Sequence, residues 1–75
     1  MNSASYVRVK AAFTVVGPKS ETFELGLDWI VGIVGYDGEG TVRIGWLQPT
    51  EFSQYAVWLE FDIKLSLLQA NTVPL

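Results

Sequence analysis

One stretch, residues 29–47, constrains the fold of this chain more than any other. Apolar β-branched and aromatic residues fill much of positions 29–34 and return at 42, 44 and 46, with Asp37-Gly38 between the two runs. An Asp-Gly dipeptide favours the positive φ angles of a tight hairpin turn. We therefore expect two antiparallel strands joined by a turn at residues 37–40. Because glycine adopts a positive φ at little cost, we also expect Gly38→Val to lower the stability of the fold more than Ser20→Val does.

Glycines interrupt both predicted strands of this hairpin, at Gly32, Gly35 and Gly45. A glycine inside a strand marks a bulge, a sharp bend or the close approach of another group. Small barrels need such bends to close. We assign these glycines to bends, and we keep open the alternative that one of them makes room for a ligand.

The segment before the hairpin is predicted as one long strand and a polar loop. Residues 6–11 alternate outward Tyr, Arg and Lys with inward Val and Ala, and the strand continues to Val16 with a bend near residues 11–12. Residues 17–21 are predicted as a loop that begins at a Gly-Pro pair. An excursion or short strand at residues 22–25 then places Phe23 and Leu25 on the core.

For part of the segment after the hairpin, the sequence leaves alternative structures open. Residues 48–53 are expected to form a loop, and residues 55–61 alternate as a strand with one core face. Residues 62–68 fit either a 3₁₀ turn before a final strand or one helical turn with Ile63 and Leu67 inward. The remaining residues, 69–75, are an edge strand or a tail. Four aromatic residues are placed in the core: Phe13, Trp29, Trp46 and Phe61.

The length predicts a single domain, residues 1–75, with residues 1–4 as a disordered lead. A chain of 75 residues buries only about 60% of the surface that its unfolded form exposes. It has no cysteine for a disulfide and no histidine for the usual zinc site. Its residues are 49% hydrophobic and only 17% charged, against about 25% charged in an average domain. We therefore expect exposed apolar surface and association with protein.

The net charge and the hydropathy of the segments argue against two classes of partner, nucleic acid and membrane. The net charge of −3 makes nucleic acid an unlikely partner, because affinity for phosphate backbones depends on clustered Lys and Arg. The first residues lack the basic start and apolar core of a secretion signal, and no run approaches the ~18 apolar residues of a membrane span. We expect a cytoplasmic protein that does not bind a membrane.

The ionisable residues do not form a catalytic pattern. Acid–base or nucleophilic catalysis usually uses histidine, cysteine or two carboxylates in different environments. Asp37 and Glu39 fall on the predicted turn, where an aspartate accepts bonds from local backbone donors, and Glu60 is expected to face solvent. We therefore predict no catalytic residue, no metal site and no cofactor, and we expect that the chain is not an enzyme.

The remaining aromatic and apolar residues predict an interaction surface instead. Tyr and Trp are enriched at interface centres because they offer large rigid area with a polar tip. We expect a self-associating chain, most simply a two-fold dimer, or a subunit of a larger complex. Six residues are predicted to form the surface: Tyr36, Phe52, Tyr55, Val57, Trp58 and Leu59.

The run from Val31 to Trp46, with its glycines, acidic turn and Val-Arg-Ile-x-Trp ending, resembles the Src-homology-3-like (SH3-like) barrel module of the mind-bomb and Herc ubiquitin ligases. Tyr55 and the downstream Asp62-Ile-Lys-Leu65 segment extend the resemblance, which covers about half of the chain. It implies an all-β, five-stranded, mostly antiparallel SH3-like barrel, with a short 3₁₀ or helical turn before the last strand. A non-catalytic protein-interaction or assembly module is the function that we predict on such a fold.

A fainter resemblance leads to an alternative function. Ile33-Val34-Gly35-Tyr36 is similar to a strand of the plasmid-borne type II dihydrofolate reductases, which are short barrels active only as tetramers around a shared pore. The active-site Val-Gln-Ile-Tyr strand of that family has no counterpart here, so no catalytic residue is carried over. The alternatives are therefore a pore-type oligomeric enzyme and a barrel that stacks single-stranded nucleic acid on its aromatic residues.

Overall fold

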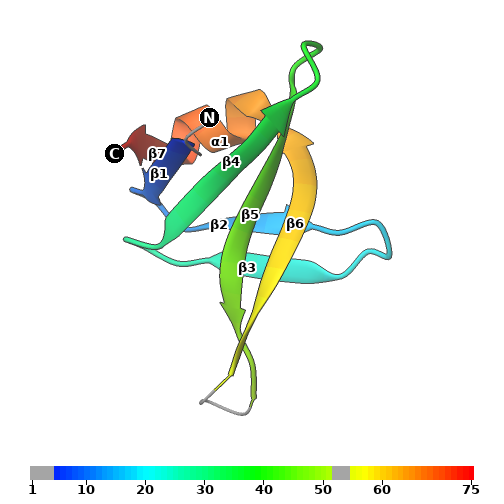
Figure 1. Cartoon of the computed structure of the whole chain (residues 1–75), viewed down its shortest axis with the longest axis vertical. Helices are drawn as coiled ribbons and strands as arrows, with labels where there is room; N and C mark the ends of the chain where they lie inside the picture. The colour runs from blue at the N-terminus through cyan, green and yellow to red at the C-terminus, as the bar shows by residue number, and fades with distance from the viewer. Residues whose placement is uncertain (1–4, 52–54) are drawn as a thin grey trace.

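The part of the chain that the structure describes is all-β apart from one short helix. The computed structural model describes residues 5–51 and 55–75, and within them the strands form two antiparallel sheets (Figure 1). The long sheet has the order β6-β5-β4-β1-β7, and β2 pairs with β3 in a separate hairpin. The elements, in chain order, are β1 (Ser5–Val9), β2 (Phe13–Val16), β3 (Thr22–Leu25), β4 (Ile30–Tyr36), β5 (Thr41–Pro49), β6 (Ala56–Lys64), α1 (Leu65–Asn71) and β7 (Thr72–Pro74).

The central hairpin of β4 and β5 has the predicted turn. The backbone N–H groups of Glu39 and Thr41 both donate to Asp37 Oδ1, at 2.7 and 3.0 Å, and Gly38 has φ 79°. The register shifts between Ile33 and Gly35, which confirms a bulge in this glycine-containing strand.

The expected comparison between Gly38 and Ser20 loses its basis in the structure. Ser20, on the loop between β2 and β3, also has a positive φ, of 63°. Valine would be strained at Ser20 as it would at Gly38, because β-branched residues disfavour this region. The two substitutions therefore do not isolate the conformation of the central turn.

The carboxylate of Asp37 gives the turn a pH dependence. Hydrogen bonds from the backbone N–H groups of Glu39 and then Thr41 lower the pKa of Asp37 in the folded protein. A folded-state pKa below the unfolded value of about 3.9 means that the carboxylate stabilises the fold above about pH 4, and that this stabilisation is lost as the pH falls through the folded pKa. We expect Asp37→Ala to melt at a lower temperature than the native chain at pH 7, with the difference disappearing in acid.

Melting curves at a series of pH values would check this expectation. Glu24→Ala, which removes a carboxylate from the exposed side of β3, is the matched control and should change the melting temperature little at pH 7. A difference between Asp37→Ala and the native chain that persists unchanged at the lowest pH would contradict the role of the charged carboxylate.

The chain changes sheets between Val9 and Phe13, so the single long first strand is wrong. Val9 and Phe13 are both buried, but they belong to different sheets. The predicted bend near residues 11–12 is present, and Ala11, which we expected to face inward, is exposed. The backbone N–H groups of Lys10 and Ala11 both donate to the carbonyl of Asn71, which holds the chain at the point where it leaves β1.

The core lies between the long sheet and the β2–β3 hairpin, which crosses it in Figure 1. Leu25 is fully buried as predicted, and Phe23 stacks on Phe61 of β6 with ring centroids 5.4 Å apart. Of the four aromatic residues predicted in the core, Phe13 and Trp46 are buried, and Trp29 and Phe61 are partly buried against them.

The C-terminal third is more regular than the sequence predicts. β5 extends through Pro49, and β6 runs to Lys64, so residues 48–49 belong to a strand and not to the predicted loop. Ile63 is buried in β6, and α1 follows with Leu68 buried and Leu67 only partly buried. The N–H of Leu65 donates to the carbonyl of Gly40, which ties α1 to the central turn. β7 then pairs with β1 as the expected edge strand.

Candidate functional site

Two glycines lie side by side on the outward face of the long sheet. Tyr6 of β1 pairs with Gly32 of β4, Gly32 pairs with Gly45 of β5, and Gly45 pairs with Glu60 of β6. Strands in a sheet are spaced about 4.8 Å apart. The two central positions of this row therefore carry no side chain across two neighbouring strands.

Trp58 of β6 fills that gap. A Cβ atom at Gly45 would overlap the Trp58 ring, and a Cβ atom at Gly32 would lie 3.4 Å from the rings of both Trp58 and Tyr6. The indole therefore lies across the two glycines, with Tyr6 beside it. The sequence analysis kept the alternative that one of these glycines makes room for a ligand. In the structure the side chain of Trp58 occupies that space.

A polar network fixes the orientation of the indole. Trp58 Nε1 donates to Glu60 Oε2 at 2.8 Å, and Arg43 Nε donates to Glu60 Oε1 at 3.1 Å. Arg43 also bonds to Asp62 at 3.3 Å. The indole N–H, and after it the guanidinium of Arg43, lower the pKa of the Glu60 carboxyl. The prediction that Glu60 faces outward agrees with this position, but the residue has specific partners that the sequence did not reveal.

Apolar side chains surround Trp58 on the same face. Tyr6, Ile30 and Trp58 are each about half exposed, and Leu47 is 62% exposed. Together they border a shallow pocket of about 560 Å³. We call this area the outer-face surface and define it by five residues: Tyr6, Ile30, Leu47, Pro49 and Trp58.

Ion pairs border the outer-face surface on two sides. Arg8 Nη1 lies 3.1 Å from Asp28 Oδ1 on the β1 side, and Arg43 pairs with Glu60 and Asp62 on the β6 side. Exposed ion pairs of this kind contribute little stability. Their effect here is to surround a neutral apolar centre with charges of both signs.

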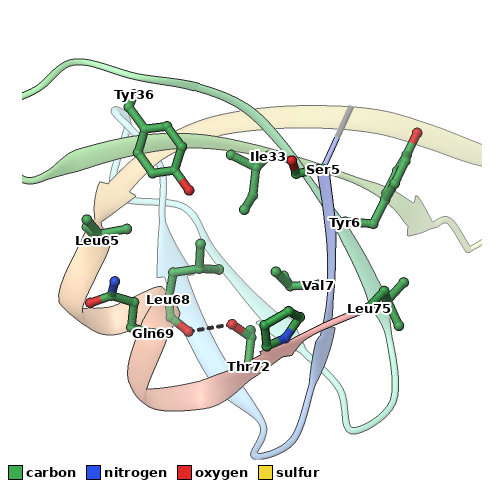
Figure 2. Close-up of a pocket in the computed structure, with 11 residues that line it drawn as sticks. Ser5, Tyr6, Val7, Ile33, Tyr36, Leu65, Leu68, Gln69, Thr72 and Leu75 are labelled. Atoms are coloured by element: carbon green, nitrogen blue, oxygen red, sulfur yellow. Dashed lines mark hydrogen bonds between the residues drawn. The ribbon is translucent and has the colours of Figure 1, made fainter. Parts of the chain in front are cut away.

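A second concave feature, a groove of about 620 Å³, lies between β4, β1, α1 and β7 (Figure 2). Ile33, Val7 and Leu68 line it, and Tyr36 stands at one end near Leu65. The hydroxyl of Thr72 is turned to the carbonyl of Leu68, to which it donates at 2.7 Å. None of the residues that line this groove is charged.

The structure does not bring together the five predicted interaction residues that it describes. Trp58 is in the outer-face surface, whereas Tyr36 is in the groove. Leu59 is partly buried against the core, and Tyr55 and Val57 are exposed at the start of β6. This end of the β5–β6 ribbon projects beyond the β2–β3 hairpin (Figure 1). The sixth residue, Phe52, lies outside the described residues.

Sequence reasoning missed four residues of the outer-face surface: Tyr6, Ile30, Leu47 and Pro49. Tyr6 was read only as the outward member of an alternating strand, and Leu47 as the end of the hairpin. One signal was available, because Gly32 and Gly45 are equally far in the sequence from the two ends of the predicted turn at residues 37–40. Counting outward from the turn brings the two glycines nearly opposite each other and predicts a gap that a large side chain must cover.

Comparison with known proteins assigns no function to this surface. No family model, curated protein or solved structure matches the chain. Within residues 5–51 and 55–75, no group of three or more His, Cys, Asp or Glu side chains is arranged to hold a metal ion. No helix in this part of the chain is long and apolar enough to cross a membrane.

Proposed function

We propose that the chain is a non-catalytic protein-interaction or assembly module built on an SH3-like barrel, and that it binds through the outer-face surface. Two features support the barrel. The long sheet places the last strand, β7, beside the first, β1, and the three-stranded meander of β4, β5 and β6 beside them. The β2–β3 hairpin packs against the same core through Phe23.

The observation that carries the function is the exposed apolar area around Trp58. Taking about 150–200 Å² for each of the five residues, about half of it exposed, leaves roughly 400–500 Å² accessible. The largest apolar patch on a typical monomer is about 300–600 Å², and such patches are often functional. A patch of this size on a chain of only 75 residues favours an interface.

The construction of the patch also favours binding to protein. A rigid tryptophan at the centre of a patch surrounded by polar residues is the pattern of interface residues that dominate binding energy. Because Glu60 accepts a hydrogen bond from the Trp58 N–H, the ring is oriented before a partner arrives, which reduces the entropy lost on binding. The two arginines at the border are paired with carboxylates, so they favour protein over a nucleic-acid backbone. We place this interaction in the cytoplasm, in keeping with a chain that has no cysteine.

Site-specific photocrosslinking in cells that produce the chain tests this function. A photoreactive benzoylphenylalanine at Ala56, which pairs with Pro49 at the border of the surface, should form adducts with protein. The same residue at Glu24, on the exposed side of β3, is the control and should form few adducts. Trp58→Ala should abolish the adducts from position 56. Equal adducts from both positions, or none to any protein from position 56, would contradict the proposal.

A further inference from the structure

We infer that the partner of the outer-face surface is a second copy of this chain, joined face to face about a two-fold axis that passes near Leu47. This inference rests on the proposed function, because it names the partner for the same surface. Three properties of the surface, its area, its shape and its charge, support a self-interface.

The exposed apolar area matches what one partner contributes to a stable dimer. A standard interface buries about 800 Å² per partner, of which about 60% is non-polar, or roughly 500 Å². The five residues of the outer-face surface leave about this area exposed. Burial of this area would also supply stability to a chain that has neither cysteine nor histidine and whose small size limits its own core.

The shape of the surface is suited to meeting its own copy. In a two-fold interface the same patch serves both subunits and must be complementary to itself. A shallow, open surface comes close to this condition, whereas a deep groove or a ridge requires a partner of the opposite shape. Gly32 and Gly45 allow the Trp58 ring to lie across the sheet, so the indole does not stand out from the surface as a ridge.

The charges around the surface favour the same partner. Each arginine at the border already has a carboxylate within 3.3 Å, so a strongly basic or strongly acidic partner would find few uncompensated charges. A second copy presents a matching surface, with an apolar centre bordered by charges of both signs. Each copy carries a net charge of −3, so the long-range repulsion between copies should weaken as salt increases.

The free edge of β6 is the competing route to self-association. Tyr55 directly precedes β6, and Val57 and Leu59 lie in the first half of this strand. The sequence predicted all three as interface residues. The other half of β6 carries Glu60, Asp62 and Lys64, and charged residues on an edge strand discourage pairing with another strand. The outer face offers more uncharged surface than this edge, so we choose the face.

Leu47 lies between Trp58 and Ile30 in the outer-face surface. It pairs directly with Trp58 of β6. Continuing the Gly32–Gly45 register by two residues brings it opposite Ile30 of β4, on its other side. A residue near a two-fold axis meets its own copy in the partner. A charge at position 47 would therefore meet the same charge across the interface.

This geometry allows a charge-exchange experiment. Leu47→Asp and Leu47→Lys should each weaken self-association by about 100-fold or more, because burying two like charges together costs several kcal/mol. Mixing the two variants in equal amounts should restore association, since Asp then meets Lys across the axis. Thr14→Asp, which adds a charge on the exposed side of β2, is the control and should dimerise like the native chain. Sedimentation at micromolar concentrations, with circular dichroism to check folding, gives the readout.

A second measurement does not depend on the charged variants. Because the chain has no cysteine, Leu47→Cys introduces a unique thiol that should form a disulfide between two copies under mild oxidation. Thr14→Cys should form far less. The disulfide at position 47 would support a two-fold axis nearby even if a charged variant failed to fold.

Three results would overturn the inference. A native chain that stays monomeric, while position 56 crosslinks to a different protein, would exclude the second copy and leave the proposed function standing. A dimer that tolerates both charges at position 47 would place the interface elsewhere, with the β6 edge as the first alternative. Folded variants that remain monomeric when mixed, with no disulfide from Leu47→Cys, would exclude an axis near Leu47.

Discussion

Replacing Trp46 with alanine is expected to lower the free energy of unfolding by about 3–5 kcal/mol, the usual cost of removing a large aromatic residue from a core. Trp46 is 1% exposed. Its ring contacts those of Phe23 and Phe61, with centroids 6.1 and 5.7 Å away, so it joins the long sheet to the β2–β3 hairpin. Its indole N–H also donates to Gln48 Oε1 at 2.9 Å, and the alanine variant leaves this acceptor without its donor.

The size of the chain makes this loss severe. At about 0.05–0.15 kcal/mol per residue, a domain of this length has a total stability of roughly 4–11 kcal/mol. Trp46→Ala should therefore lose between about a quarter and all of this stability, as measured by circular dichroism during urea denaturation. Tyr36→Ala, which removes an aromatic residue that is 61% exposed, is the control and should cost about 1 kcal/mol or less. Equal losses in the two variants would show that Trp46 does not join the two layers of the core.

The parts of the fold that the sequence predicted correctly are those with local causes. Asp37 and Gly38 determine a turn by their own backbone preferences, and the alternation on either side then aligns the strands. The short strand containing Phe23 and Leu25 was predicted for a similar reason, because a polar loop ends directly before it. These signals act over a few residues and do not require knowledge of the rest of the chain.

The parts that were missed depend on contacts between distant segments. The mostly apolar segment from Val9 to Val16 suggests one strand, but the backbone N–H groups of Lys10 and Ala11 donate to the carbonyl of Asn71 near the other end of the chain. The helix α1 was left as one of two alternatives for a related reason. It has no side-chain cap, and its start is tied to Gly40 of the central turn.

The candidate site was predicted only in part because its members lie on four strands. Trp58 was chosen correctly as an exposed aromatic residue, but Tyr6 is far from it in the sequence and comes close only through the sheet register. Tyr36 was also correctly expected to be exposed, yet it lies in the groove. Exposure can be estimated from composition and alternation, whereas the grouping of exposed residues requires the order of the strands.

Gly45→Ala is expected to cost about 1–3 kcal/mol, the range for adding atoms to a well-packed site. Its Cβ would lie 2.8 Å from Trp58 Cε2 and closer still to Trp58 Cζ2, so the indole must leave its place over the two glycines. Displacing the ring would also break the Trp58–Glu60 hydrogen bond. The variant should therefore lose stability and, because the indole no longer lies across the sheet in the outer-face surface, lose self-association as well.

Gly35→Ala is the matched control, because this glycine lies on the same pair of strands with no atom within 4 Å of the added Cβ. It should be neutral or stabilising by up to about 1 kcal/mol, since alanine restricts the unfolded chain. Combining Gly45→Ala with Trp58→Ala then identifies the cause. If the indole is what the new methyl group displaces, Gly45→Ala should cost little once the indole is gone, with a coupling energy of about 0.5–3 kcal/mol in urea denaturation. An undiminished cost in the Trp58→Ala background would mean that Gly45 is required by the backbone of β5 and not by the tryptophan that lies over it.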